Sequence, residues 1–98
     1  MTITKNLSGD TLTIALTGRL DTTTAPELEA ELKTALDGVS ELIMDLEKLD
    51  YMSSAGLRVL LSAQKRMTRQ GEMKVVHVNA VIMEIFDVTG FVDILTIE

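Results

Sequence analysis

The sequence predicts an α/β fold in a single domain, residues 1–98, with a mixed, mostly parallel sheet of four to five strands and three or more helices packed mainly on one face. Three observations lead to this prediction. Two N-terminal runs alternate apolar and polar residues around a turn, which is typical of a β-hairpin. Two later apolar runs are each followed by a segment with helical periodicity. Strands that are connected through helices pair in parallel, by right-handed crossovers.

The chain opens with a hairpin and a helix. The two strands of the hairpin are expected at residues 2–7 and 11–17, joined by the turn Ser8-Gly9-Asp10. The first helix is expected to begin at Thr24-Ala25-Pro26-Glu27, which has the form of a capping box with proline in the first turn. Asp37-Gly38 should end this helix. Its buried face is expected to consist of Leu28, Leu32, Ala35 and Leu36.

The middle of the chain predicts a strand, a helix and a second strand. Glu41–Leu46 is almost continuous in apolar side chains, as expected for a strand that is covered on both faces. The helix is expected over Ser54–Gln70, with Gly71 as its stop. Met73–Val78 should form the second buried strand. The apolar stripe of the helix is expected to consist of Leu57, Leu60, Leu61 and Met67.

A third helix and a short strand are expected near the C-terminus. Asn79 is a suitable cap for a short helix that ends near Gly90. Residues 93–97 are a candidate for a last short strand, so the element order is ββαβαβα with a possible final strand. The side chains that this helix should turn inward are Val81, Ile82, Ile85 and Phe86.

Composition and charge exclude several classes of function. The formal net charge is −6, which disfavours nonspecific binding to nucleic acid or to an anionic membrane. The chain has no cysteine, so it has no disulfide framework and no thiol chemistry, in keeping with a reducing compartment. The N-terminus lacks the apolar segment of a signal peptide, and no apolar run approaches the ~20 residues of a spanning helix. We therefore expect a cytoplasmic protein without a membrane-inserted segment.

The sequence supplies little for catalysis. Its one histidine, His77, follows Val75-Val76 in an apolar run, and no Gly-x-Ser-x-Gly elbow surrounds Ser53 or Ser54. A serine nucleophile needs a base within hydrogen-bond reach, so we expect His77 to be a strand-end or packed histidine instead of a catalytic one. There is no cysteine–histidine pair at metal-ligand spacing and no EF-hand loop. We expect no enzyme activity, no metal and no cofactor.

The most informative stretch is Tyr51-Met52-Ser53-Ser54-Ala55-Gly56-Leu57, which lies between a predicted strand and a predicted helix. A serine at this junction can cap the helix, because it accepts a hydrogen bond from a free backbone N–H group. It can also carry a phosphate, because the helix N-terminus favours negative charge. The local pattern leaves both interpretations open. Gly56 indicates a close approach of the backbone at a tight strand-to-helix turn.

Four short motifs, taken together, carry a family resemblance. They are Gly18-Arg19-Leu20-Asp21, Leu42-Ile43-Met44-Asp45-Leu46, the serine stretch, and Phe86-Asp87-Val88-Thr89-Gly90-Phe91. In this order they closely resemble the STAS domain of bacterial anti-sigma factor antagonists, over essentially the whole chain. The resemblance implies phosphorylation of a serine in the loop between the third strand and the second helix. Alignment on Gly56-Leu57 matches that serine to Ser54.

Two positions differ from some members of the family. Ser53 stands where those members have an aspartate before the phosphorylated serine, which leaves Ser53 as a minor rival acceptor. Ala55 stands where they have a second hydroxyl. The form Ser-Ser-Ala-Gly-Leu resembles another common variant of the family, and it leaves the identity of the kinase open.

The resemblance also implies partners. Unphosphorylated members bind an anti-sigma factor that is also a GHKL-type serine kinase, which frees a sigma factor, and a PP2C-type phosphatase reverses the modification. Asp21 matches an acidic residue near the phosphosite and is assigned to partner contact. Members are commonly monomers or weak dimers. The expected contact surface consists of Asp21, Thr22, Thr23, Ser53, Ser54, Gly56 and Arg58.

Two other functions stay open at this point. STAS domains also resemble subunits of stressosomes and accessory subunits of lipid-transport complexes, which would make this chain a binding module without a phosphorylation switch. A Ser54→Ala protein that still cycles normally in cells would favour that alternative. The other possibility is an enzyme, which turnover of a nucleoside triphosphate or an ester by the purified protein would support.

Overall fold

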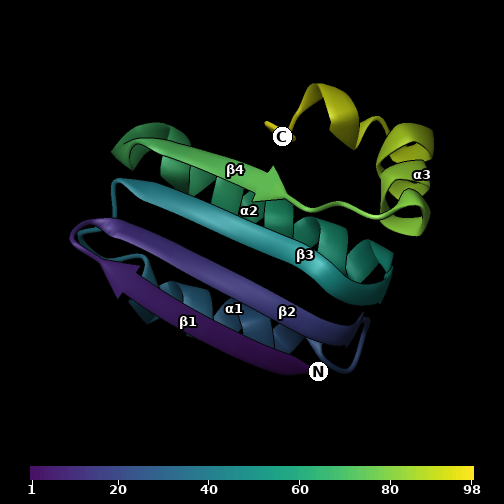
Figure 1. The fold of residues 1–98 in the computed structure, drawn as a ribbon, viewed down its shortest axis with the longest axis horizontal. Helices are drawn as coiled ribbons and strands as arrows, with labels where there is room; N and C mark the ends of the chain where they lie inside the picture. Colours follow the sequence, from purple (N-terminus) through teal and green to yellow (C-terminus); the bar gives the residue numbers. More distant parts are fainter.

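Four strands form one sheet in the order β1-β2-β3-β4 (Figure 1). The computed structural model describes residues 1–98. The strands are β1 (Thr2–Ser8), β2 (Thr11–Leu20), β3 (Glu41–Met52) and β4 (Glu72–Val76). β1 pairs antiparallel with β2, while β2–β3 and β3–β4 pair in parallel, so the predicted mixed and mostly parallel sheet is confirmed.

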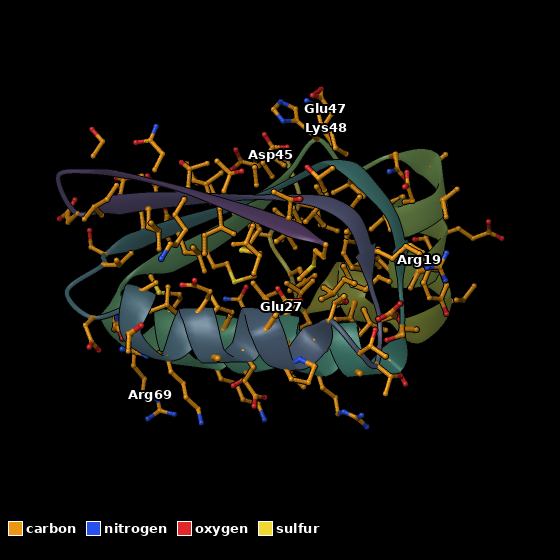
Figure 2. All side chains as sticks on the ribbon, turned by 90° about the horizontal axis from the view of Figure 1, so that it is seen from below. Arg19, Glu27, Asp45, Glu47, Lys48 and Arg69 are labelled. Atoms are coloured by element: carbon orange, nitrogen blue, oxygen red, sulfur yellow. The ribbon has the colours of Figure 1, made fainter.

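Three α-helices complete the fold: α1 (Ala25–Ala35), α2 (Ser54–Gln70) and α3 (Ala80–Thr89), followed by a 3₁₀ turn, η1 (Phe91–Asp93). Figure 1 shows α1 and α2 side by side behind the sheet, whereas α3 lies beyond the carboxyl end of β4. The opposite face of the sheet carries no helix (Figure 2). The carboxyl ends of β2 and β3 and the first turn of α2 therefore meet at one end of the domain.

The core between the sheet and the helices is almost entirely aliphatic. Phe86 is its only aromatic residue, and the buried methionines Met44, Met52, Met67 and Met73 fill the space that aromatic rings occupy elsewhere. No polar or charged residue is fully buried. The fold is thus held mainly by hydrophobic burial, with polar contacts confined to the surface and the loops.

β3 is twice as long as predicted and is covered on one face only. Leu42, Met44 and Leu46 are buried under the helices, whereas Ile43 and Asp45 lie half-exposed on the open face. The expectation of a strand covered on both faces is therefore wrong. Beyond Leu46 the pairing with β2 shifts register twice, and the burial pattern changes from every second to every third residue. Such irregularities hide a strand from a search for strict alternation.

Helix α1 lacks the expected capping box. Thr24 is the N-cap residue, but its side chain makes no capping bond to the helix. The first free N–H groups are satisfied differently, because the backbone N–H groups of Thr24 and Ala25 donate to the carbonyl oxygen of Asp21. Pro26 is in the first turn, as expected. The α1 terminus is consequently shaped by Asp21, four residues before the helix.

Two helix faces differ from the prediction. In α2 the side chain of Leu61 is only partly buried, and Val59 and Ala63 take its place in the core. In α3, Val81 is 55% exposed, while Ile82 and Phe86 are buried. A short helix at the end of a sheet contacts the core along a narrow face, so its remaining apolar residues stay at the surface.

The C-terminal residues form no fifth strand. Phe91–Asp93 is a 3₁₀ turn, and the only later pairing is a single parallel bridge between Val75 and Ile97. The N–H group of Val75 donates to Thr96 O at 2.8 Å, and the N–H group of Glu98 donates to Val75 O at 2.9 Å. The sheet therefore has four strands, the lower of the two expected numbers.

Candidate functional site

The predicted contact residues come from two segments that meet at the carboxyl end of the sheet. Leu20, the last residue of β2, pairs with Met52, the last residue of β3. The N–H group of Ser53 then donates to Leu20 O at 2.8 Å. This bond joins the end of β2 to the start of α2, so the loop that carries Asp21 lies beside the first turn of that helix.

The two serines take different local roles. Ser53 is the N-cap of α2, and its hydroxyl accepts a hydrogen bond from Gly56 N at 3.4 Å. Ser54 is the first residue of the helix, and its side chain is exposed. On sequence grounds either serine could cap the helix, and in the structure Ser53 does so. The Ser54 hydroxyl faces solvent at the positive end of a 17-residue helix.

Gly56 allows the first turn of α2 to lie very close to the sheet. A Cβ atom at this position would lie 2.7 Å from Leu20 Cγ and 3.0 Å from Met52 Cγ. Real Cβ atoms do not approach other atoms this closely, so only glycine fits without a shift of its neighbours. The expected close backbone approach is confirmed, and it makes Gly56 a packing residue beneath the candidate surface.

A network centred on Asp21 orders the loop between β2 and α1. Asp21 Oδ1 accepts hydrogen bonds from Thr23 Oγ1 at 2.7 Å, Thr23 N at 3.0 Å and Thr24 N at 3.1 Å. The hydroxyl of Thr24 donates to Arg19 O and accepts from Asp21 N, both at 2.8 Å. Hydrogen bonding to the charged carboxylate, first of all from the Thr23 side chain, lowers the pKa of Asp21.

Arg19 and Tyr51 belong to the same surface, although neither is among the contact residues expected from the sequence. Arg19 Cζ lies 4.5 Å from the centroid of the Tyr51 ring, and Arg19 Nε lies 3.8 Å from Asp21 Oδ2. Arg19 and Tyr51 are register partners across β2 and β3. This pairing becomes predictable only if β2 is extended to Leu20 and β3 to Met52, because the expected strands end at Thr17 and Leu46.

Thr22 and Arg58 meet across a shallow depression of about 250 Å³ between the two segments. Ala25, Pro26, Ala55 and Val59 form much of its floor, and Glu29 of α1 also lines it. Arg58 is exposed and follows Ser54 by four residues, so the two side chains lie on one face of α2. The two predicted segments therefore form a continuous surface of mixed charge.

His77 lies away from this surface. It follows β4 directly, adopts a left-handed backbone conformation (φ 55°) and is 59% exposed. Its Nδ1 lies 3.1 Å from Asp45 Oδ1, on the face of the sheet that carries no helix, where Figure 2 shows Asp45. His77 is thus a strand-end histidine, as expected, but it is not packed. No group of three or more histidine, aspartate or glutamate side chains is arranged to hold a metal ion.

No helix of the structure is both long enough and apolar enough to cross a membrane. The longest, α2, has 17 residues and carries four basic side chains.

Comparison with known proteins identifies the family. The sequence matches the family model of the STAS domain over residues 2–98. It is 35% identical to BtrV of Bordetella bronchiseptica, provisionally described as an anti-sigma factor antagonist, over 99% of this chain and 85% of that protein. It is 32% identical to the anti-sigma-B factor antagonist of Staphylococcus aureus, over 83% of this chain and 77% of that protein.

Solved structures share the fold at lower identity. An anti-sigma factor antagonist from Mycobacterium paratuberculosis superposes with a TM-score of 0.89 at 21% identity, covering 98% of this chain and 83% of that chain. Unphosphorylated SpoIIAA superposes with a TM-score of 0.85 at 20% identity, covering 99% and 88%. The family match and the relatives that are more than 30% identical agree with the architecture, and this chain belongs to the STAS domain family.

Proposed function

We propose that this protein is a cytoplasmic anti-sigma factor antagonist, without enzyme activity of its own, that works by partner switching. In its unphosphorylated form it binds a GHKL-type anti-sigma factor serine kinase through Asp21, Thr22, Thr23, Ser53, Ser54 and Arg58, and Gly56 lets α2 begin close to the sheet beneath them. Phosphorylation of Ser54 by that kinase weakens the complex, and a PP2C-type phosphatase restores binding. The domain acts as a monomer or a weak dimer.

This proposal rests mainly on the different structural positions of the two serines. Ser53 caps α2 with its hydroxyl, whereas Ser54 presents its hydroxyl to solvent one residue later. A kinase can modify an exposed hydroxyl without breaking the helix start. The N-terminus of α2 also tolerates the added negative charge, so the fold need not change when the affinity changes.

The negative charge of a phosphate on Ser54 would weaken the complex with the kinase. A phosphate adds about −1.5 to −2 charges at neutral pH, at the centre of the proposed contact surface. Asp21 and Asp50 are nearby in the chain segments that border this surface, and they would add to the repulsion of an acidic partner group. Disruption of a close interface by a charge costs ~2–5 kcal/mol, which corresponds to a roughly 30- to 5,000-fold loss of affinity.

The named relatives support both parts of the proposal. The relatives from Staphylococcus aureus and Bacillus subtilis are named anti-sigma-B factor antagonists. SpoIIAA, which has the same fold, has been solved in an unphosphorylated and a phosphorylated form, with TM-scores of 0.85 and 0.77 to this chain.

The test begins with the protein from its native cells under two growth conditions. Peptide mass spectrometry should find one phosphate, on Ser54, whose occupancy changes with the condition. The anti-sigma factor kinase from the same cells should then bind Ser54→Ala like the wild type and bind Ser54→Asp at least tenfold more weakly. Ser53→Ala should still be phosphorylated.

Ser8→Asp is the matched control, because Ser8 is an exposed serine at the end of β1, outside the proposed contact surface. It should weaken binding much less than Ser54→Asp. A Ser54 that is never occupied, together with stable co-purification in one complex, would refute the switch and favour a subunit without phosphorylation.

A further inference from the structure

Three cations of α2 form an exposed stripe that begins one turn after Ser54. Arg58, Lys65 and Arg69 are all exposed, and with Ser54 and Ser62 they recur at intervals of four, four, three and four residues. This spacing places all five side chains on one face of the helix. We call Arg58, Lys65 and Arg69 the α2 basic stripe.

The stripe has no acidic partner within the chain. The ion pairs of the structure involve Lys5, Arg19, Arg66, Lys74 and His77, but no member of the stripe. α2 itself contains no aspartate or glutamate. Arg66, the fourth cation of α2, faces another way: it binds Asp37 and two carbonyl oxygens of α1. Glu29 lines the same depression as Arg58, but the two form no ion pair.

Helix α2 carries three of the five lysines and arginines that form no ion pair, in a chain with nine basic and fifteen acidic residues. Figure 2 shows Arg69 pointing outward from the helical layer, on the side opposite Asp45 and Glu47. The stripe starts one helical turn after the proposed phosphorylation site and runs along the helix for roughly 16 Å, the rise of the eleven residues from Arg58 to Arg69. It therefore extends the proposed contact surface over the outer side of α2.

We propose that the α2 basic stripe docks an acidic surface of the protein partner that the Ser54 site binds, and that a phosphate on Ser54 acts in part by occupying Arg58. This inference rests on the proposed function. An opposite charge attracts the partner and orients it, which raises both association rate and specificity. A phosphate at Ser54 lies one helical turn from Arg58, so it would pair with that guanidinium and remove it from the stripe.

A protein partner fits the stripe better than a membrane or a nucleic acid does. The large exposed apolar residues Leu7, Tyr51, Val81, Val88 and Ile94 all lie outside α2, so the stripe has no side chain to insert into a bilayer. Lipid-binding clusters carry about four to eight basic residues, and nucleic acid binding also needs several phosphate contacts. Three cations in a protein of net charge −6 suffice only for a local acidic patch.

The test compares two double variants with the same change in net charge. Lys65→Gln/Arg69→Gln removes two stripe cations and leaves the proposed contact residues intact. Lys5→Gln/Lys48→Gln removes two cations elsewhere, from the β1 edge and from an exposed position on β3. Affinity for the purified anti-sigma factor kinase is measured at 50 mM and 500 mM salt. At 50 mM salt the stripe variant should bind about tenfold more weakly than the wild type. At 500 mM salt its affinity should be close to that of the wild type, because salt screens the charges.

Equal affinities of the two double variants would overturn the docking proposal. Binding of the wild type to vesicles of 70% phosphatidylcholine and 30% phosphatidylserine, lost in the stripe variant while kinase binding is kept, would overturn it in favour of a membrane. The proposed function fails separately: if Ser54→Asp binds normally but the stripe variant binds weakly, the switch is refuted and the docking surface stands.

A second measurement tests the role of Arg58 without any partner. Phosphoserine is installed at position 54, and the second pKa of the phosphate is measured by phosphorus NMR. Arg58→Gln should raise this pKa, because the guanidinium favours the dianion. Arg69→Gln should leave it unchanged, since Arg69 lies fifteen residues and about 22 Å further along the helix. Equal values in wild type and Arg58→Gln would show that Arg58 does not hold the phosphate.

Discussion

Gly56 of α2 and Leu20 of β2 are in such close contact that a methyl group on Gly56 would lie 2.7 Å from Leu20 Cγ. Gly56→Ala should therefore destabilise the domain by about 1 kcal/mol, because overpacking costs ~1–3 kcal/mol and better helix propensity returns up to ~1 kcal/mol. Urea denaturation measures the change. Leu20→Ala should cost less in the Gly56→Ala background than in the wild type, since it removes the clash. A Gly56→Ala protein more stable than the wild type would contradict this account.

The two serines should separate stability from function. Ser53→Ala removes the α2 cap and should lower the free energy of unfolding by about 0.5–1 kcal/mol, at the low end for caps because its hydrogen bond is long at 3.4 Å. Ser54→Ala should change it by less than ~0.5 kcal/mol, as is usual for an exposed residue. Thermal and urea unfolding of the two variants check the difference. Equal losses in both would mean that Ser54 shares the capping role.

Asp21 should make stability depend on pH. Its pKa is lower in the folded chain than in the unfolded chain, so the ionised carboxylate stabilises the fold above the ordinary aspartate pKa of ~3.9. That contribution is lost as the pH falls through the lowered pKa. At pH 7, Asp21→Asn should therefore unfold at a lower urea concentration than the wild type. The difference between the two unfolding midpoints should shrink near pH 3. Asp50→Asn, at an exposed position of β3, is the control and should show no comparable gap.

Asn79 should hold α3 onto the sheet. Its Oδ1 accepts from Ile82 N at 3.0 Å, and its Nδ2 donates to Leu49 O at 2.7 Å. Asn79→Ala loses both bonds and should destabilise the domain by about 1–3 kcal/mol. Asn79→Ser keeps a capping oxygen but not the bond to β3, so its free energy of unfolding should lie between those of the wild type and Asn79→Ala. Amide hydrogen exchange should show the largest loss of protection in α3, and a uniform loss over the sheet would contradict this assignment.

The backbone conformation of His77 should lower the stability of the fold. Its left-handed φ of 55° is unfavourable for a residue with a Cβ atom, and glycine adopts it freely. His77→Gly should stabilise the domain by roughly 0.5–1 kcal/mol, less whatever the exposed contact with Asp45 contributes. His77→Ala keeps the cost and loses the contact, so it should be slightly less stable than the wild type. If His77→Gly is no more stable than His77→Ala, the backbone at this position carries no strain.

Most of the fold was predictable because its strands and helices bury apolar residues with clear periods. The hairpin, the three helices and the order of elements follow from these periods. The errors have local physical causes. Strict alternation predicts β3 only as far as Leu46, because the bulged half of the strand departs from that pattern. Helical periodicity predicts a buried Val81, because a period cannot show how narrow a contact face is. Residues 93–97 are too few to distinguish a strand from a single bridge.

The surface around Ser54 was only partly predictable. Its two segments follow from family motifs, whereas the contact of Arg19 with Tyr51 depends on a register that only the full lengths of β2 and β3 provide. The opposite roles of Ser53 and Ser54 depend on where the helix begins to within one residue, which sequence patterns do not fix. The Asp21 network replaced an expected capping box because one carboxylate oxygen reached three donors at once.

The position of Tyr51 gives the domain a built-in optical reporter. The chain has no tryptophan and one tyrosine, and that ring lies partly exposed under the guanidinium of Arg19, next to the Asp21 loop. Because the two phenylalanines emit only weakly, almost all intrinsic ultraviolet emission comes from the edge of the proposed contact surface. A partner that docks there and carries a nearby tryptophan would quench this emission by energy transfer, so complex formation could be followed in real time on unlabelled, unmutated protein.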